Sequence, residues 1–485
     1  MLLRPEISQK DEGRERLNAA SFSAEDYFAL AMGLLLGLTL WKFGNPVVLD
    51  SVVSAPNSLA EAWSETWPPR WAFWLMIPLA LSGCGLRLRN QIWWPETRWL
   101  WVLPCVWFAW QLVAGVFTVD AWLTRMTLMQ FGGCMACYFL GAWFLGTRRR
   151  FHLVLAIALA AFAICLVRAV SQKLFEFPED QRTLLEGQRT GWTNFPPSLI
   201  AQFKASGTII ATNGVDMVNP VVLLKYAKGR VHGTLVYPNA LAGAVLLLLP
   251  VSLALAFDRT RQFRPATRLA AISLTMFLGF GALFWTGSKS GWLIGVLLIC
   301  VWLLRLNWSA RLKWSLIAVV VAGGTFLFAV RFQKYFVTGA TSVSARFDYW
   351  HAAVQNTVNH PWLGSGPGTF QRPYAQLKAP GSEMARLAHN DYLEQFSDSG
   401  VIGGLSYCAW IILLLGRLGR HLWRTADPIE FAVFVGLLGW FVQGVSEFSL
   451  FVPALAWLAF TFAGSLLQFQ FRSTTSESPA SVAVR

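Results

Sequence analysis

The sequence has few charged residues. Asp, Glu, Lys and Arg make up 14% of its 485 residues, whereas a typical soluble domain contains about 25%. Hydrophobic residues make up 55% of the chain. This composition excludes an ordinary soluble protein and predicts an integral membrane protein. The 25 tryptophans fit the same interpretation, because indole rings favour the boundary between membrane and water.

Acidic residues are scarcer than basic ones, 26 against 40, which gives a formal net charge of +14. Such an excess could indicate a nucleic-acid partner. Many of the basic residues, however, lie in short links between apolar runs, at 87–89, 148–150, 259–268, 305–313 and 417–424. Basic links are typical of the cytoplasmic loops of membrane proteins. We therefore expect contact with membrane lipids and no nucleic-acid partner.

Cysteine and histidine are also few, at 7 and 6 residues. Cys134 and Cys137 have the CxxC spacing of some metal and redox sites, but they lie inside an apolar run with no second pair and no histidine nearby. We interpret them as small packing residues. The segments expected outside the membrane contain no convincing DxD motif and no cluster of His and Cys, so we expect no metal ion and no cofactor.

Twelve apolar runs have about the length and composition of transmembrane helices. They cover residues 24–41, 71–86, 99–117, 126–146, 151–171, 238–257, 269–286, 291–305, 314–330, 401–418, 429–446 and 453–471. We therefore expect an all-α integral membrane protein with about twelve transmembrane helices, in one membrane domain over 24–471. The charged residues 1–23 and the polar residues 472–485 are expected to be cytoplasmic tails, the second of them disordered.

Two long polar stretches interrupt the apolar runs, at 172–237 and 331–400. Because the Arg-rich links follow the even-numbered runs, both chain ends are expected in the cytoplasm and both stretches on the outer face. A short turn expected on the same face, TGSKSGW at 286–292, lies between them in the sequence. Basic residues recur on all three pieces. If the pieces converge, they form a pocket suited to a polyanion such as a diphosphate.

The second long stretch ends in LAHNDYLEQFSDSG at 387–400, which combines one histidine with three carboxylates. At helical spacing, one face carries His389, Tyr392, Leu393 and Phe396, while Asp391, Glu394 and Asp398 point elsewhere. Gly400 is expected to end this helix. A histidine on an apolar face at the membrane surface is costly unless it has a partner or takes part in chemistry. His389 is therefore either a satisfied structural residue or a catalytic one.

Four motifs together resemble the O-antigen ligase family, which also contains related polysaccharide polymerases. HNDYLEQFSDSGVIGG, with Asn390, is similar to the His-Asn segment that precedes a late transmembrane helix in this family. GTLVYPNALAG, with Pro238 and Asn239, resembles the family's Gly-Thr…Pro-Asn start of a middle helix. TGSKSGWL resembles its Ser-Arg-Gly turn, and RFDYWHAAVQNTVNHPWLGSGPGTF resembles its Arg…Trp…Pro…Gly-x-Gly segment. The four motifs cover roughly residues 225–420.

The resemblance implies a GT-C-like membrane glycosyltransferase of the bacterial plasma membrane that acts on the periplasmic face. Such an enzyme takes a glycan from an undecaprenyl diphosphate carrier and joins it to a sugar hydroxyl of a glycan, lipid or protein acceptor. It uses neither a metal ion nor a nucleotide. Basic residues then have to neutralise the diphosphate leaving group.

The resemblance also implies roles for individual residues. His389 would activate or orient the acceptor hydroxyl. Asp391 and Glu394 are candidates to fix its tautomer or neighbouring basic groups, although each could equally belong to a solvated carboxylate face. Arg230 lies just before the Gly-Thr…Pro-Asn motif, where the family carries a diphosphate-binding arginine; a structural ion pair is the alternative.

Two further basic residues are candidates for binding the diphosphate. Arg346 could do so, or it could cap the amphipathic segment behind it. Lys289 stands where the family usually has arginine. Lysine keeps the positive charge but loses the bidentate fork of a guanidinium group, so this departure leaves the donor and the activity open.

Two other functions compete with a ligase. A polymerase of the same family would join repeat units to each other with the same donor chemistry. A transporter or flippase without enzymatic activity would place ionisable residues near the middle of the membrane. Arg168 is the main charged residue inside an apolar run, and it lies close to the outer end, where it can snorkel. Polar residues instead concentrate in the two long stretches, which favours chemistry at the surface over conduction.

Overall fold

The computed structural model describes residues 22–88, 98–212, 214–333, 341–380, 382–424 and 427–476. Most of these residues lie in helices, and the described strands are β1 (Ile209–Thr212) and β2 (Val215–Val218), which pair antiparallel. The predicted all-α class is confirmed. Most residues of the predicted tails, 1–23 and 472–485, lie outside the described residues. Residues 472–476 continue α20, so the prediction of a disordered tail is wrong for its first five residues.

Each of the twelve predicted apolar runs falls on a helix. These helices are α2 (Ala24–Lys42), α4 (Pro69–Leu88), α5 (Trp99–Val116), α6 (Ala121–Phe144), α7 (Arg148–Ser171), α11 (Pro238–Arg259), α12 (Pro265–Thr286), α13 (Lys289–Arg305), α14 (Ala310–Arg331), α18 (Asp391–Leu422), α19 (Pro428–Gln443) and α20 (Pro453–Ser476). Among the described residues, eight helical stretches are long and apolar enough to cross a membrane, and Pro428–Gln443 and Pro453–Gln468 are shorter apolar helices. The protein is a multi-pass membrane protein, while the number of about twelve crossings stays a prediction.

Polar caps and a glycine set several helix boundaries. Ser23 and Asp26 form a capping box at the start of α2, and the side chains of Asp120 and Asp427 cap α6 and α19. Gly287, at φ +60°, ends α12 in the left-handed conformation that glycine adopts without strain. The chain can therefore turn directly from α12 into α13.

Small residues bring helices of the bundle close together. The main helix pairs are α6 with α20, α2 with α7, α11 with α19, and α5 with α18. A Cβ added to Gly464 would lie 2.0 Å from the carbonyl O of Tyr138, and one added to Gly141 would lie 2.5 Å from that of Thr461. Glycine lets the backbones of α6 and α20 approach this closely, as in many transmembrane helix pairs.

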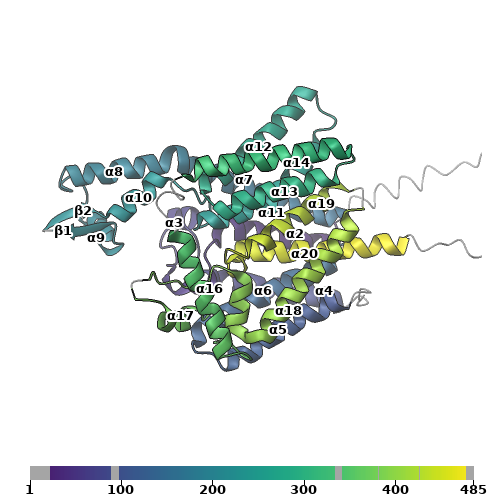
Figure 1. Cartoon of the computed structure of the whole chain (residues 1–485), viewed down its shortest axis with the longest axis horizontal. Coiled ribbons are helices and arrows are strands. Elements are labelled where there is room, and N and C mark those ends of the chain that lie inside the picture. The colour runs from purple at the N-terminus through teal and green to yellow at the C-terminus, as the bar shows by residue number, and fades with distance from the viewer. Residues whose placement is uncertain are drawn as a thin grey trace, which may run out of the picture.

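The bundle has two different ends (Figure 1). At one end, α2 and α7 both begin, and Nε of Arg150 lies 3.0 Å from Oδ1 of Asp26. The other end carries the two long segments, one between α7 and α11 and one between α14 and α18. We call it the loop end. The two segments thus share one end of the bundle, and its assignment to the outer side of the membrane stays a prediction.

The first long segment forms a lobe, residues 172–229, which extends from the bundle (Figure 1). It contains the π-helical turn η2 (Gln172–Glu176), α8 (Phe177–Arg189), α9 (Pro197–Ala205), the β1–β2 hairpin and α10 (Pro220–Lys228). The lobe has a hydrophobic core of its own around Leu184, Trp192, Ile209 and Val218.

The described helices of the second long segment pack against the bundle itself. α16 (Thr341–Asn359) lies against α18, and α17 (Gln371–Leu377) packs on α16. Because α16 contacts α18, the second segment places residues of α16 next to α18.

Three short elements complete the architecture: η1 (Val47–Val52), α3 (Leu59–Ser64) and η3 (Ser449–Phe451).

Candidate active site

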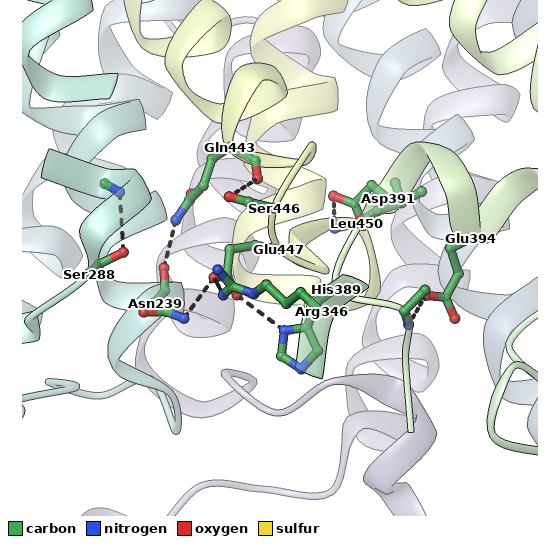
Figure 2. Close-up of polar contacts among 12 residues, drawn as sticks. Asn239, Ser288, Arg346, His389, Asp391, Glu394, Gln443, Ser446, Glu447 and Leu450 are labelled. Carbon is green, nitrogen blue, oxygen red and sulfur yellow. Dashed lines mark hydrogen bonds and ion pairs between the residues drawn. The ribbon is translucent and has the colours of Figure 1, made fainter. Parts of the chain in front are cut away.

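Glu447 lies at the centre of a polar site at the loop end (Figure 2). It follows α19 in the short link before η3, and its side chain is 4% exposed. Its Oε1 accepts a hydrogen bond from Nδ2 of Asn239 at 2.7 Å and pairs with Nη2 of Arg346 at 2.5 Å. The start of α11, the helix α16 and the α19–η3 link therefore meet on one carboxylate.

Arg230 joins this network through Asn239. Its Nη2 donates a hydrogen bond to Oδ1 of Asn239 at 2.8 Å, and its Nε donates to the carbonyl O of Thr286 at 2.6 Å. Burial lowers the pKa of Arg230 below its ordinary value; the charge of Glu447 opposes this shift, and that of Arg346 adds to it. The side chain is thus a partly desolvated cation held by neutral acceptors.

Lys289 begins α13 directly after its N-cap, Ser288, whose Oγ accepts a hydrogen bond from the N–H of Gly291 at 3.2 Å. Burial lowers the pKa of Lys289 below its ordinary value, and the positive charges of Arg230 and Arg346 lower it further. The structure therefore brings together the three residues predicted to bind a diphosphate. We call Arg230, Lys289 and Arg346 the basic cluster.

Two more cations act on the basic cluster. Arg331, at the end of α14, lowers the pKa of Arg230, and Lys228, at the end of α10, lowers that of Lys289. Arg331 was not among the residues predicted to bind an anion. The local charge is positive despite Glu447, and such an environment favours an anionic ligand.

His389 lies beside Glu447, just before α18. Its Nδ1 is 3.7 Å from Oε2 of Glu447. The imidazole stacks on Tyr349, with ring centroids 5.8 Å apart, and meets Phe448 edge to face at 4.7 Å. The side chain is 30% exposed. Two aromatic rings thus orient the imidazole while part of it remains accessible to a substrate.

The predicted helical position of His389 is wrong. α18 begins at Asp391, because Asn390 is its N-cap and accepts hydrogen bonds at Oδ1 from the N–H groups of Tyr392 and Leu393, each at 3.0 Å. His389 lies outside the helix at φ +53°. This left-handed conformation costs a non-glycine residue roughly 1–2 kcal/mol. His389 therefore does not share a helical face with Tyr392 and Leu393.

Asp391 and Glu394 are buried, with 2% and 0% exposure, so the solvated face considered for them is wrong. The carboxylate of Asp391 accepts a hydrogen bond from the N–H of Leu450 at 3.2 Å, and that of Glu394 accepts one from the N–H of Ala388 at 2.5 Å. Both carboxylates thus hold backbone near His389. Their predicted role in fixing its tautomer stays a prediction.

A glycine-rich loop fixes the first part of α18. As predicted, Gly400 breaks the helix, at φ +69°. The N–H of Gly366 donates to the carbonyl O of Asp398 at 2.9 Å, and the N–H of Gly368 donates to its Oδ2 at 2.6 Å. The Gly-x-Gly motif of loop 361–370 therefore binds α18 next to the break.

The same part of α18 is also bound by α5 and α16. Nε1 of Trp107 and Nε2 of Gln111 each donate to Oε1 of Gln395 at 2.9 Å. Nδ2 of Asn356 donates to the carbonyl O of Ser397 at 2.8 Å. Hydrogen bonds from three directions thus hold the start of α18 and, with it, the histidine that precedes the helix.

The Pro-Asn motif at the start of α11 has a clear structural effect. Pro238 occupies the first helical position, where its missing N–H costs nothing. The side chain of Asn239 accepts a hydrogen bond from Arg230 and donates one to Glu447. The backbone carbonyl O of Asn239 accepts a hydrogen bond from Nε2 of Gln443 at 2.9 Å. Asn239 therefore sets the distance between a cation and the buried carboxylate.

Within the described ranges, no group of three or more His, Cys, Asp or Glu side chains could hold a metal ion. Cys134 and Cys137 are buried in α6 as free thiols. The candidate site consists instead of cations, one imidazole and one carboxylate.

Glu447 was missed in the sequence. It is the one carboxylate of VQGVSEFSL at 442–450, where the apolar run 429–446 passes into the short link before the run 453–471. An ionisable residue so close to membrane-spanning segments is a candidate for function. The position of Glu447 between two apolar runs was thus a signal for function in the sequence, but the histidine motif was a more specific signal for a catalytic site.

The helices long and apolar enough to cross a membrane define a multi-pass membrane protein. One end of their bundle carries a histidine and a basic cluster, which form a candidate site for an anionic ligand. Residues 274–408 match the family model described as O-antigen ligase. This match confirms the resemblance of that part of the chain to the O-antigen ligase family. The matched segment includes Lys289, Arg346 and His389, while Arg230 and Glu447 lie outside it. No curated protein matches the chain.

Proposed function

We propose that the protein is a membrane glycosyltransferase that transfers a glycan from an undecaprenyl diphosphate-linked donor to an acceptor sugar outside the plasma membrane. The observation that carries the proposal is the convergence of Arg230, Lys289 and Arg346 near His389. Cations beside a group that can accept a proton suit a reaction in which a hydroxyl attacks and a diphosphate leaves. The family match supports the same class of reaction.

The basic cluster is proposed to bind the diphosphate. Arginine presents several N–H groups to phosphate oxygens and stays protonated at any working pH. Negative charge increases on the diphosphate as it leaves. The cations therefore stabilise the transition state more strongly than the bound donor, which lowers the barrier. The proposal assigns no metal ion to this step.

His389 is proposed to act as the general base. The acceptor oxygen forms a bond to the anomeric carbon of the donor sugar while the bond from that carbon to the diphosphate oxygen breaks. The hydroxyl proton passes to the imidazole, and Glu447, 3.7 Å from Nδ1, stabilises the imidazolium. Asp391 and Glu394 are proposed to keep the backbone near His389 in place.

The loop end is proposed to face the outside of the plasma membrane, with both chain ends in the cytoplasm. The Arg-rich links 148–150 and 259–268 lie at the opposite end of the bundle, where α7 begins and α11 ends. This is the orientation expected from the positive-inside rule. It gives the site access to a lipid-linked donor in the outer leaflet.

The proposal is tested by transfer with the purified full-length protein. The reaction contains an undecaprenyl diphosphate-linked oligosaccharide and EDTA, with a lipid-linked core oligosaccharide or no further acceptor, and the products are resolved by mass. Transfer to the core identifies a ligase, and lengthening of the donor glycan identifies a polymerase of the same family. His389→Ala, shown by thermal unfolding to be folded, is expected to form neither product. No transfer by the wild-type protein to either acceptor would contradict the proposal and favour a transporter.

A further inference from the structure

The bundle contains an apolar cavity of about 750 Å³ among α11, α12, α13 and α19. Its walls are mainly aliphatic and aromatic side chains, such as Leu249, Phe280 and Leu298. Among the described residues that line it, the ionisable ones are Arg261 and Arg305, and none is acidic. A cavity of this volume is large enough for a small amphiphilic ligand or part of a lipid.

This cavity is separate from the candidate active site. At the loop end, α11, α12 and α13 approach each other closely: a Cβ added to Gly291 would lie 3.0 Å from Cβ of Ala242 and 3.2 Å from Cδ1 of Leu283. Ala242 and Leu283 are both buried. This three-helix contact lies between the cavity and the basic cluster, so a ligand in the cavity uses other residues for its charge.

The charged part of the cavity lies at the end of the bundle opposite the loop end. α11 and α13 both begin at the loop end; Arg261 follows the end of α11, and Arg305 is the last residue of α13. Asn307 and Trp308 line the cavity in the same region. Indole groups favour the membrane–water boundary. The cavity is therefore apolar inside, and the ionisable side chains that line it near the membrane surface are two arginines.

The length of the cavity corresponds to one leaflet of a bilayer. Along α11 the lining extends from Val245 to Phe257, which is about 18 Å at a rise of 1.5 Å per residue. The hydrocarbon core of a bilayer is about 30 Å thick, so each leaflet contributes about 15 Å. An acyl chain of a single leaflet therefore has a matching length.

Aromatic rings position both arginines. The guanidinium carbon of Arg305 lies 4.1 Å from the ring centroid of Phe431, and that of Arg261 lies 5.6 Å from the centroid of Phe257. Nε of Arg261 also lies 3.6 Å from Oδ1 of Asp258. A guanidinium that stacks on a ring keeps its N–H groups in its own plane, where they can bind phosphate oxygens.

We propose that this cavity binds an anionic phospholipid, with an acyl chain among α11, α12 and α13 and the phosphate at Arg261 and Arg305. In a zwitterionic lipid, the phosphate is already balanced by a cation of the same headgroup. A diphosphate carrier would place its charge at the basic cluster, at the other end of the bundle. Basic pockets between transmembrane helices at the cytoplasmic surface bind anionic lipid headgroups in other membrane proteins.

The proposal is tested by lipid binding to the delipidated full-length protein. Phosphatidylglycerol, phosphatidylcholine and undecaprenyl phosphate are added in detergent, and bound lipid is measured by native mass spectrometry, with thermal unfolding as a second readout. The wild-type protein is expected to prefer phosphatidylglycerol and to unfold at a higher temperature in its presence. Arg261→Gln/Arg305→Gln is expected to bind it about 30-fold more weakly, which corresponds to about 2 kcal/mol for two basic residues at a membrane surface.

Two further variants control for charge and for shape. Arg264→Gln/Arg311→Gln removes two exposed arginines that do not line the cavity and is expected to bind like the wild type. Gly295→Leu leaves both cavity arginines in place but fills part of the cavity, and is expected to lose phosphatidylglycerol binding.

Three results would overturn the proposal. Equal binding of phosphatidylcholine would remove the role of the headgroup charge. Full phosphatidylglycerol binding by Arg261→Gln/Arg305→Gln or by Gly295→Leu would place that lipid elsewhere. A preference of the wild-type protein for undecaprenyl phosphate would assign the cavity to the carrier. The wild-type preference decides the question even where a variant fails to fold.

Discussion

Nδ1 of His389 lies 3.7 Å from Oε2 of Glu447, while the other oxygen of this carboxylate is bound by Arg346 and Asn239. One buried carboxylate thus connects the imidazole with the basic cluster. A change at Glu447 therefore affects both the group proposed to accept the proton and a group proposed to bind the diphosphate.

Glu447→Gln keeps the size of the side chain and removes its charge. We expect kcat for transfer to fall about 100-fold or more, the lower part of the range for general acid–base catalysis, because the imidazolium loses its negative partner. Glu447→Asp keeps the charge and is expected to retain more activity. Steady-state kinetics at saturating donor measure the effect, with Glu186→Gln, an exposed carboxylate of the lobe, as the control. An unchanged kcat in Glu447→Gln would exclude this role.

His389→Gly and His389→Ala separate chemistry from backbone strain. Both variants remove the imidazole, and we expect both to lose transfer at least 100-fold. Only glycine relieves the left-handed conformation at φ +53°, so the glycine variant is expected to be more stable than the alanine variant by up to about 1 kcal/mol. Thermal unfolding in detergent measures the difference. Transfer retained by either variant would contradict a catalytic role for His389.

Lys289→Arg is expected to change the pH dependence of donor binding. Burial and neighbouring cations lower the pKa of Lys289. Lys289 therefore loses its positive charge at a lower pH than an ordinary lysine, whose pKa is about 10.4. We therefore expect the KM for the donor to increase on the alkaline side in the wild type. Arginine stays protonated there, and the increase should disappear in Lys289→Arg. The same alkaline increase in both proteins would show that another group causes it.

Arg230→Ala is expected chiefly to weaken use of the donor. Arg230 is held by Thr286 and Asn239 in a partly desolvated position, where contacts to a charged ligand are strong. We expect the KM for the donor to increase at least about tenfold, which corresponds to about 1.4 kcal/mol. Arg182→Ala, an exposed arginine of α8, is the matched control. An unchanged kcat/KM for the donor in Arg230→Ala would argue against a role of Arg230 at the diphosphate.

Gly364→Ala is expected to disturb the contact between loop 361–370 and α18. A Cβ at this position would lie 2.4 Å from both the carbonyl C of Asp398 and the carbonyl O of Ser397, and the residue has φ +61°. We expect the free energy of unfolding to fall by about 1–3 kcal/mol or more. Gly416→Ala is the control within α18, because a Cβ there meets nothing within 4 Å and alanine favours a helix. Equal unfolding temperatures of the two variants would contradict the described contact.

The helices could be predicted well from the sequence. Length and hydropathy select the segments that cross a membrane, because every backbone polar group there has to be satisfied within its own helix. The three members of the basic cluster could also be identified, since they lie in loops between apolar runs. That these three residues lie close together could not be predicted, because residues 230, 289 and 346 meet only through the packing of α11, α13 and α16.

The local conformation at His389 was harder to predict. Its spacing to Tyr392 and Leu393 is helical, yet the side chain of Asn390 caps the helix one residue later. Periodicity alone does not distinguish a helical residue from one just before the cap. Glu447 was missed for another reason: its partners Asn239 and Arg346 lie 208 and 101 residues away in the sequence.

The break at Gly400 divides α18 into a long apolar part after the break and a short first part, residues 391–399, which directly follows His389 and Asn390. α5, α16 and loop 361–370 hold this first part in place, so the imidazole before it has a fixed position relative to the bundle. A donor whose diphosphate lies higher or lower in the bilayer would miss it. Under the proposed mechanism, substrates are therefore selected by depth as well as by charge, because the headgroup has to lie at the level of one fixed side chain.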